Sequence, residues 1–76
     1  MKNSVKIDTV LRKYFNLQLQ KACREGNIEN VLFYIENGAD DLIIAEGEAI
    51  CYSNHNIALL IRTINMQQTN NPLSKL

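Results

Sequence analysis

The sequence predicts an all-α fold, namely a short helical solenoid of two helix–turn–helix repeats preceded by an N-terminal capping helix. Three observations support this prediction. Apolar residues recur at positions i, i+3, i+4 and i+7 over most of the chain, which places them on one face of a helix. One proline and three glycines divide the chain into short segments. A pattern of four apolar residues occurs twice, as expected for repeat proteins.

The composition is that of one small globular domain. The chain has 76 residues, of which 46% are hydrophobic, a fraction that excludes wholesale disorder. Eight Lys and Arg balance eight Asp and Glu, so the formal net charge is zero. The excess of basic residues typical of a general phosphate-backbone binder is therefore missing. A chain this short buries little surface by itself, which makes a partner plausible.

The first predicted element is the capping helix over residues 4–15. Its apolar stripe begins after Ser4, a suitable N-cap, and consists of Ile7, Val10, Leu11 and Tyr14. Either Asn16 separates this helix from the next one or a single helix runs through it, and we favour the break. The apolar stripe is expected to cover the first inner face of the solenoid, which needs a cap.

The first repeat is predicted over residues 17–46. Its first helix carries Leu19, Ala22 and Cys23 and ends at Gly26. Asn27 caps the second helix, whose stripe is Ile28, Val31, Leu32 and Ile35 and which ends at Asn37–Gly38. From residue 39 to residue 47 the helical spacing lapses.

The second, degenerate repeat is predicted over residues 47–66. A short helix over residues 48–53 leads to a turn at residues 54–56, where His55 or Asn56 must reverse the chain. The final helix repeats the earlier stripe with the same spacing, as Ile57, Leu60, Ile61 and Ile64. Residues 67–76 are polar, contain Pro72 and are expected to form a flexible tail.

The segment from Leu19 to Asp40 resembles an ankyrin repeat. The resemblance rests on the Ala22–Cys23 pair, on the Gly26–Asn27 pair that follows it, on Ile28–Glu29, and on the closing Gly38–Ala39–Asp40. Of the T-P-L-H-x-A signature of the family, only Leu19 and Ala22 match. Residues 47–65 resemble a degenerate copy, and together the two units cover about two thirds of the chain.

The resemblance implies a fold of stacked helix pairs and a protein-binding function. Ankyrin-like proteins bind other proteins through hairpin tips and through exposed positions of the first helix of each repeat. At these positions the chain has the charged residues Lys21, Arg24, Glu25, Glu46 and Glu48. The alternative interpretation of these charges is an ordinary solvated face.

The predicted function is that of a small protein–protein interaction module that binds or blocks a partner, such as a viral or bacterial modulator of a larger complex. The alternative is a structural subunit of a homo-oligomer. The spacing of Ala22, Gly26 and Leu32 also fits a DNA-binding helix–turn–helix. Its recognition helix would carry Glu29 and Glu36 and no Lys or Arg, so no nucleic-acid partner is expected.

Catalysis has little support in the sequence, and we expect no enzyme activity, no cofactor and no metal site. Cys51 and His55 are separated by a predicted turn, and Cys23 occupies a small core position. Two cysteines and one histidine do not complete a four-ligand zinc site. No apolar run approaches the ~20 residues of a membrane span. We expect a cytoplasmic protein without a membrane partner, in the host cytoplasm if it is viral or a secreted effector. The terminal tripeptide, residues 74–76, matches a peroxisomal address and is the alternative.

Three apolar residues are predicted to bind a partner. Ile43 lies in a run of β-branched residues, which either folds under the second repeat or forms an exposed strand edge. Leu59 and Met66 lie on the outer face of the final helix, toward the position of a third repeat, where a dimer or a partner would cover them. By the same geometry Phe33 and Tyr34 are expected to meet the second repeat.

Overall fold

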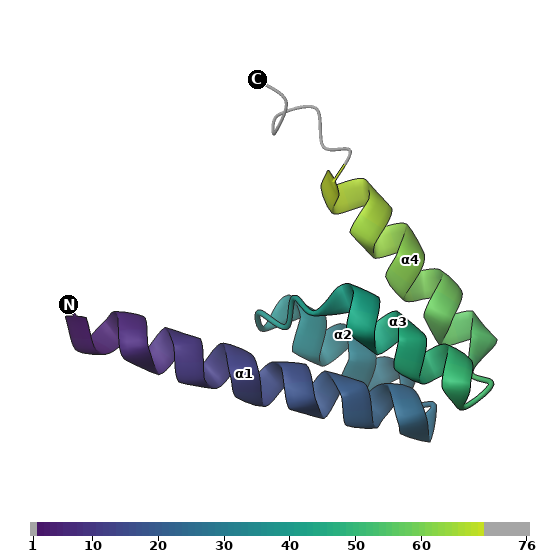
Figure 1. Cartoon of the computed structure of the whole chain (residues 1–76), viewed down its shortest axis with the longest axis horizontal. Helices are drawn as coiled ribbons and strands as arrows, with labels where there is room; N and C mark the ends of the chain where they lie inside the picture. The colour runs from purple at the N-terminus through teal and green to yellow at the C-terminus, as the bar shows by residue number, and fades with distance from the viewer. Residues whose placement is uncertain (1, 70–76) are drawn as a thin grey trace.

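Within the residues that the structure describes, the chain folds into four α-helices connected by short turns, as the computed structural model shows (Figure 1). The structure describes residues 2–69, with side chains for residues 8–68. The helices are α1 (Lys2–Glu25), α2 (Ile28–Glu36), α3 (Leu42–Cys51) and α4 (His55–Thr69). No strand occurs within these residues. The predicted all-α class is confirmed, and the expectation of five helices is wrong.

The turn between α1 and α2 follows the prediction. Gly26 adopts a φ of +74°, the left-handed conformation that glycine tolerates best. The backbone N–H of Asn27 donates to the carbonyl oxygen of Ala22 over 3.0 Å. The Asn27 side chain accepts a hydrogen bond from the backbone N–H of Asn30, which caps α2. At the other end of α2, Gly38 has a φ of +116°, and the predicted end at residues 37–38 is confirmed.

The turn between α3 and α4 has the same geometry with different residues. Ser53 takes the left-handed conformation, with a φ of +62°. The backbone N–H of Asn54 donates to the carbonyl oxygen of Ala49 over 2.8 Å. His55 and Asn56 belong to the first turn of α4, so the prediction that one of them reverses the chain is wrong. The chain therefore forms two helical hairpins, α1–α2 and α3–α4, in which Ser53 is the structural equivalent of Gly26.

The repeated apolar stripe does not occupy equivalent positions in the two hairpins. When the turns are aligned, Ile28 corresponds to His55, and Ile57 corresponds to Asn30. Ile28 directly follows its cap and is exposed, while Ile57 lies two positions further along its helix and is buried. Such a shift rotates a side chain by about 200° around a helix. The turns therefore define which residues of the two hairpins are equivalent. The two copies of the apolar stripe do not occupy equivalent positions.

The predicted helix break at Asn16 is wrong, since α1 is continuous from Lys2 to Glu25. The side chain of Asn16 is buried and forms hydrogen bonds to the loop between α2 and α3. Its Oδ1 accepts hydrogen bonds from the backbone N–H groups of Asp40 (2.7 Å) and Asp41 (3.0 Å), and its Nδ2 donates to the carboxylate of Asp40. A side chain bonded to another segment does not compete with the backbone of its own helix.

The predictions for residues 39–53 are also corrected. We expected an irregular or extended segment followed by a helix over residues 48–53, but α3 runs from Leu42 to Cys51. Leu42, Ala45 and Ala49 are buried at positions i, i+3 and i+7, so helical burial outweighs the weak β propensity of the run. Ile43 is 75% exposed on this helix. Both alternatives for Ile43, burial under the repeat and a strand edge, are therefore wrong.

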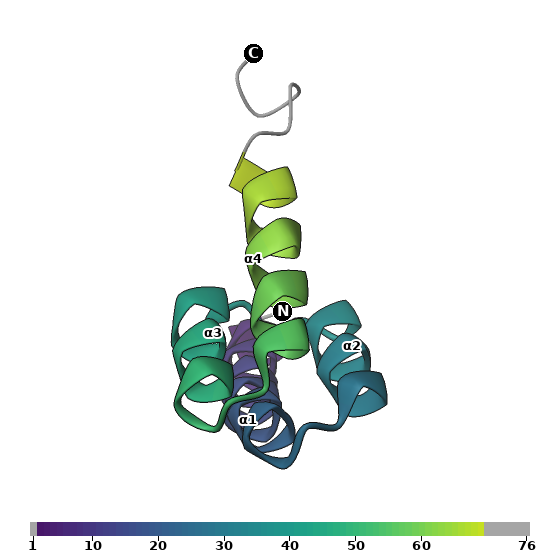
Figure 2. The ribbon, with the colours of Figure 1, turned by 90° about the vertical axis from the view of Figure 1, so that its right-hand side faces the viewer.

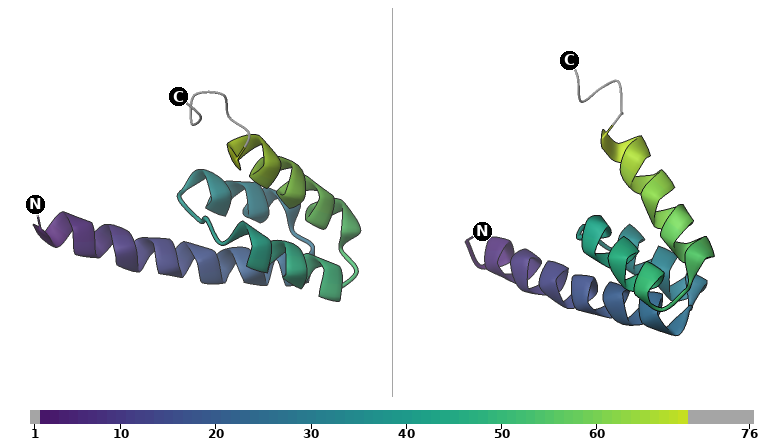
Figure 3. Two further views of the ribbon diagram at one scale, coloured as in Figure 1. Left: turned by 45° about the horizontal axis from the view of Figure 1, so that its top comes forward. Right: turned by 45° about the vertical axis from the view of Figure 1, so that its right-hand side comes forward.

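The core lies between α1 and its two neighbours α2 and α3, and between α3 and α4. Figures 2 and 3 show α2 and α3 on two sides of α1, and α4 beside α3. The buried side chains come from all four helices and from Ala39 in the loop between α2 and α3. On the helices they are Leu19, Ala22, Cys23, Val31, Leu42, Ala45, Ala49, Ile57, Ala58 and Ile61. The small residues at 22 and 23 are buried as the sequence predicts, because α1 approaches its neighbours closely there.

An aromatic cluster joins α1 to α2 outside this core. The ring of Phe15 lies 5.6 Å from that of Tyr14 and 5.9 Å from that of Tyr34, which in turn contacts Phe33. Tyr34 thus packs against Phe15 of α1 rather than meeting the second hairpin as predicted, and Phe33 is 52% exposed. At the chain ends, residues 67–69 belong to α4 rather than to a tail, and residues 70–76, with the terminal tripeptide, lie outside the described residues.

Candidate functional site: two exposed apolar faces

The two cysteines of the described residues lie in different environments. Cys23 is buried, and this burial raises the pKa of its thiol to about 11, with the nearby Glu48 carboxylate adding to the shift and Arg24 opposing it. The thiol stays protonated at neutral pH and is a poor nucleophile. Cys51 is exposed on the surface. Among the residues whose side chains are described, no three His, Cys, Asp or Glu cluster in a way that could hold a metal.

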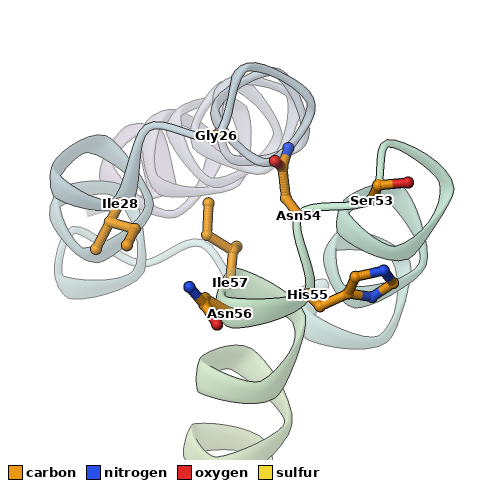
Figure 4. A pocket seen from close by; sticks show the side chains of 7 residues that line it. All are labelled: Gly26, Ile28, Ser53, Asn54, His55, Asn56 and Ile57. Atoms are coloured by element: carbon orange, nitrogen blue, oxygen red, sulfur yellow. The ribbon is translucent and has the colours of Figure 1, made fainter.

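A shallow depression of about 310 Å³ separates the two hairpin turns (Figure 4). Its floor is formed by Ile57, which points from α4 toward Gly26, while His55 is directed to the other side. The Nδ2 of Asn54 donates to the carbonyl oxygens of Cys23 (2.7 Å) and Arg24 (3.2 Å). These bonds satisfy carbonyls that the end of α1 leaves without helical partners. The polar groups of the depression therefore hold the two hairpins together.

The charged residues predicted at the hairpin tips do not form one patch. Arg24 and Glu48 meet across α1 and α3, with 3.4 Å between guanidinium nitrogen and carboxylate oxygen. Glu46 lies elsewhere and pairs with Arg62 of α4 at 3.1 Å, a contact that the sequence analysis missed. Lys21 and Glu25 are exposed at the end of α1. Three of the five predicted charges thus link helices within the chain.

One exposed apolar face runs along α1 and is called here the outer stripe. It consists of Val10, Tyr14 and Leu17, at positions i, i+4 and i+7, and continues to Lys21. Val10 is 65% exposed and Leu17 is 62% exposed, because this stripe lies opposite the side of α1 that carries Leu19 and Cys23. The N-terminal half of α1 extends past the other helices (Figures 1 and 3). The predicted role of Val10, Leu11 and Tyr14 as a cap over an inner face does not match their exposure.

Charge distinguishes the outer stripe from the rest of the chain. Residues 2–13 contain four basic residues, at positions 2, 6, 12 and 13, and one acidic residue, Asp8. Residues 14–69 contain three basic and seven acidic residues. Arg12 forms an exposed ion pair with Asp40 at 3.9 Å, which secures the middle of α1 to the loop between the hairpins. Since Arg12 pairs with Asp40, the basic residues beside the outer stripe are Lys13, three positions after Val10, and Lys21, four positions after Leu17.

A second exposed apolar face, called here the end face, spans α3 and α4 on the side away from α1. Its apolar residues are Ile43 and Ile50 of α3 and Leu59 and Met66 of α4, which are between 48% and 75% exposed. Gly47 lies between the two isoleucines, and the Glu46–Arg62 ion pair crosses the face. Of the predicted binding residues, Leu59 lines a hollow together with Ile50, and Ile43 lines another hollow together with Asn65 of α4. Gly47 and Ile50 were missed, although their i, i+4, i+7 spacing from Ile43 was visible in the sequence.

The comparisons with known proteins leave the two faces to be interpreted on their own chemistry. Neither models of protein families, nor curated proteins, nor solved structures give a match to the chain. Within the described residues, no helix combines the length and the apolar character that crossing a membrane requires.

Proposed function

We propose that the chain is a small protein-binding module, built of two ankyrin-like helical hairpins, that holds an acidic amphipathic segment of a partner protein along the outer stripe of α1. The observation that carries the proposal is the position of Val10, Tyr14 and Leu17 opposite the core. Contiguous apolar surface of this kind marks interaction sites in soluble proteins. Tyrosine in particular is enriched in the cores of protein interfaces.

The charge of the surroundings supports an acidic partner. Lys13 and Lys21 flank the outer stripe, and residues 2–13 carry a formal charge of +3 from four basic residues and one acidic residue. Complementary charge raises association rates and excludes unsuitable partners. The C-terminal end of the stripe adjoins Arg24 and Glu25, two of the residues to which the ankyrin resemblance assigns binding. In this proposal the activity is binding without catalysis, and the exposed thiol of Cys51 fits the reducing cytoplasm.

The experiment that tests the proposal is affinity purification of the tagged full-length chain from its native host, followed by binding assays with the captured protein. We expect one stoichiometric protein with an acidic binding segment, and weaker capture as salt is raised. Leu17→Lys should reduce the affinity at least tenfold, because it places a charge in the apolar stripe. Tyr52→Lys is the matched control, since Tyr52 is 56% exposed but lies in the turn after α3. Equal affinity of the Leu17→Lys variant, with its helical circular dichroism intact, would contradict the proposal.

A further inference from the structure

The two isoleucines of the end face, Ile43 and Ile50, occupy positions in the second hairpin whose equivalents in the first hairpin are covered by the second hairpin. Counting back from the equivalent turn residues Gly26 and Ser53 pairs Asn16 and Cys23 of α1 with Ile43 and Ile50 of α3. Asn16 and Cys23 are buried, under the second hairpin and the loop that leads into it. Ile43 and Ile50 are 75% and 48% exposed. The second hairpin thus presents apolar side chains at the stacking positions, with no third hairpin among residues 2–69 to cover them.

We infer that the end face is covered by the end face of a second copy of this chain, in a two-fold symmetric dimer. This inference does not rest on the proposed function, because a dimer of this kind leaves the outer stripe of α1 accessible. Two-fold contacts use the same patch on both subunits, so the patch must be complementary to itself. The end face meets that condition in polarity, in charge and in shape.

Polarity distinguishes an end-to-end dimer from a head-to-tail stack. In the second hairpin, Ala45 and Ile57 are buried in the core shared with the first hairpin. Their equivalents in the first hairpin are Gln18 and Asn30, which line a polar depression between α1 and α2 together with Lys21. A head-to-tail stack would press the apolar end face against these polar groups and leave them without hydrogen-bond partners. Pairing two end faces avoids that cost.

Charge is complementary across a two-fold axis that runs between α3 and α4 along their length. Such an axis lays α3 of each copy over α4 of the other. Glu46 of one copy then faces Arg62 of the second copy, and the reverse, so that two acidic and two basic groups alternate with no net charge. The opposite choice, with α3 over α3, would bring the two Glu46 carboxylates together and is disfavoured.

Shape complementarity comes from Gly47. This residue lies in the interior of α3 without a positive φ, and a Cβ built on it would meet no atom of the chain within 4 Å. A glycine in a helix interior lowers helix stability relative to alanine, and a Cβ at Gly47 would not clash with the other described helices. It leaves a notch between Ile43 and Ile50, beside the hollow that Ile50 lines together with Leu59 of α4. With the axis just described, Leu59 of each copy enters the notch of the other.

The size of the contact sets the expected affinity. Four apolar side chains around one ion pair make a small interface, well below the ~800 Å² per partner of standard stable complexes. Affinity depends on the quality of the contacts as well as on their area, and for a contact with so few side chains we expect a weak dimer, with a dissociation constant on the order of 10 µM. The full-length chain should therefore be a monomer at low micromolar concentration and a dimer at several hundred micromolar.

Sedimentation equilibrium of the full-length chain over this range tests the inference. We expect the mass to rise from 8.7 kDa toward twice that value. Leu59→Lys should abolish the rise, and Tyr52→Lys should leave it unchanged. Gly47→Ala is the sharper variant, because its two effects have opposite signs. It should raise the melting temperature of the monomer through helix propensity and weaken the dimer at least tenfold by filling the notch.

Two further variants test the charge arrangement. Glu46→Lys and Arg62→Glu should each prevent self-association, because each places like charges opposite one another in the dimer. When the two variants are mixed, each charge again faces an opposite one, and a heterodimer should form. A monomer at all concentrations of the unmodified chain would overturn the inference. A dimer insensitive to Leu59→Lys and Gly47→Ala would overturn it as well.

Failure of the dimer and failure of the proposed function give different results. If only the dimer is wrong, the chain stays monomeric and Leu17→Lys still loses the captured partner. If only the proposed function is wrong, Leu59→Lys abolishes self-association and Leu17→Lys has no effect on the captured protein. Loss of self-association on Leu17→Lys, with Leu59→Lys without effect, would place the dimer on the outer stripe and overturn both.

Discussion

The two hairpins reverse the chain with the same backbone hydrogen bonds, but the longer helix comes first in one hairpin and second in the other. In the first hairpin α1 has 24 residues and α2 has nine, whereas in the second α3 has 10 and α4 has 15. The long helix of each hairpin therefore extends past its short partner. Val10 and Tyr14 on α1, and Met66 on α4, are exposed along these extensions. Part of the exposed apolar surface of this chain therefore lies where the pairing of helices stops.

The hairpins differ also in what covers them. The first hairpin is covered by the second through polar contacts as well as through the apolar core. Asn16 binds the loop that leads into α3, and Asn54 binds the last carbonyls of α1. The second hairpin has Ile43 at the position of Asn16, and an isoleucine side chain cannot form such hydrogen bonds. Since hairpins of this size are not stable alone, these junction contacts are expected to decide the stability of the whole chain.

The largest effect is expected when the junction itself is broken. Asn16→Ala removes the acceptor of two backbone N–H groups, those of Asp40 and Asp41, and leaves them without partners in a part-buried site. The free energy of unfolding should fall by about 2–3 kcal/mol. Urea denaturation followed by circular dichroism measures the change.

A matched control for this variant is Asn37→Ala. The Asn37 side chain also bonds a backbone group, the carbonyl of Phe33, but it is exposed to solvent. Its removal should cost less than about 0.5 kcal/mol. Similar losses for the two variants would show that the Asn16 contacts do not hold the hairpins together.

The sequence predicts the elements whose signals are local. Gly26 and Asn27 define the first turn, and Gly38 defines the end of α2, because the backbone conformation at these positions selects for few residues. The small residues Ala22 and Cys23 predict a close approach of two helices, because larger side chains would not fit there. The predicted first turn, the predicted end of α2 and the predicted burial of Ala22 and Cys23 are confirmed.

The elements that were predicted wrongly depend on contacts distant in sequence. Asn16 looks like a helix breaker until its partners in the loop before α3, Asp40 and Asp41, are known. The run from Leu42 to Ala45 looks extended until its buried residues are seen to share a face with Ala49. The end face was only partly predicted, since Leu59 and Met66 follow from helical spacing once α4 is known, whereas Gly47 and Ile50 require α3.

A smaller effect, with a defined pH dependence, is expected from Cys23, which is buried where the second hairpin has the exposed Ile50. The pKa of its thiol is raised from 9.0 to about 11 in the folded state. Below pH 9 both states keep the proton, so this group does not change stability. Between pH 9 and 11 the unfolded chain loses the proton while the folded chain keeps it. The free energy of unfolding should therefore fall over this range by about 1–2 kcal/mol.

Stability curves of Cys23→Ala and Cys51→Ala between pH 8 and pH 11 isolate this contribution. Contributions that the three proteins share cancel in the comparison. Cys51→Ala should keep the slope of the unmodified chain, because its thiol is exposed, and Cys23→Ala should be flatter. Parallel curves for all three proteins would contradict the assignment.

The smallest effect sharpens the comparison of the two turns, where one left-handed position holds a glycine and the other a serine. Ser53 has a φ of +62°, a conformation that costs a residue with a Cβ about 1 kcal/mol. Ser53→Gly should therefore stabilise the chain by about 0.5 kcal/mol, because the added flexibility of the unfolded glycine offsets part of the gain. The opposite kind of change in the first turn, Gly26→Ala, adds a Cβ at a left-handed position. It should destabilise the chain by about 1–2 kcal/mol, since the Cβ also comes within 3.2 Å of the Asn54 side chain that joins the hairpins. Urea denaturation of both variants at pH 7 measures the asymmetry. If the two substitutions shift stability by equal and opposite amounts, the turns differ only in backbone strain, and the contact between Gly26 and Asn54 contributes nothing.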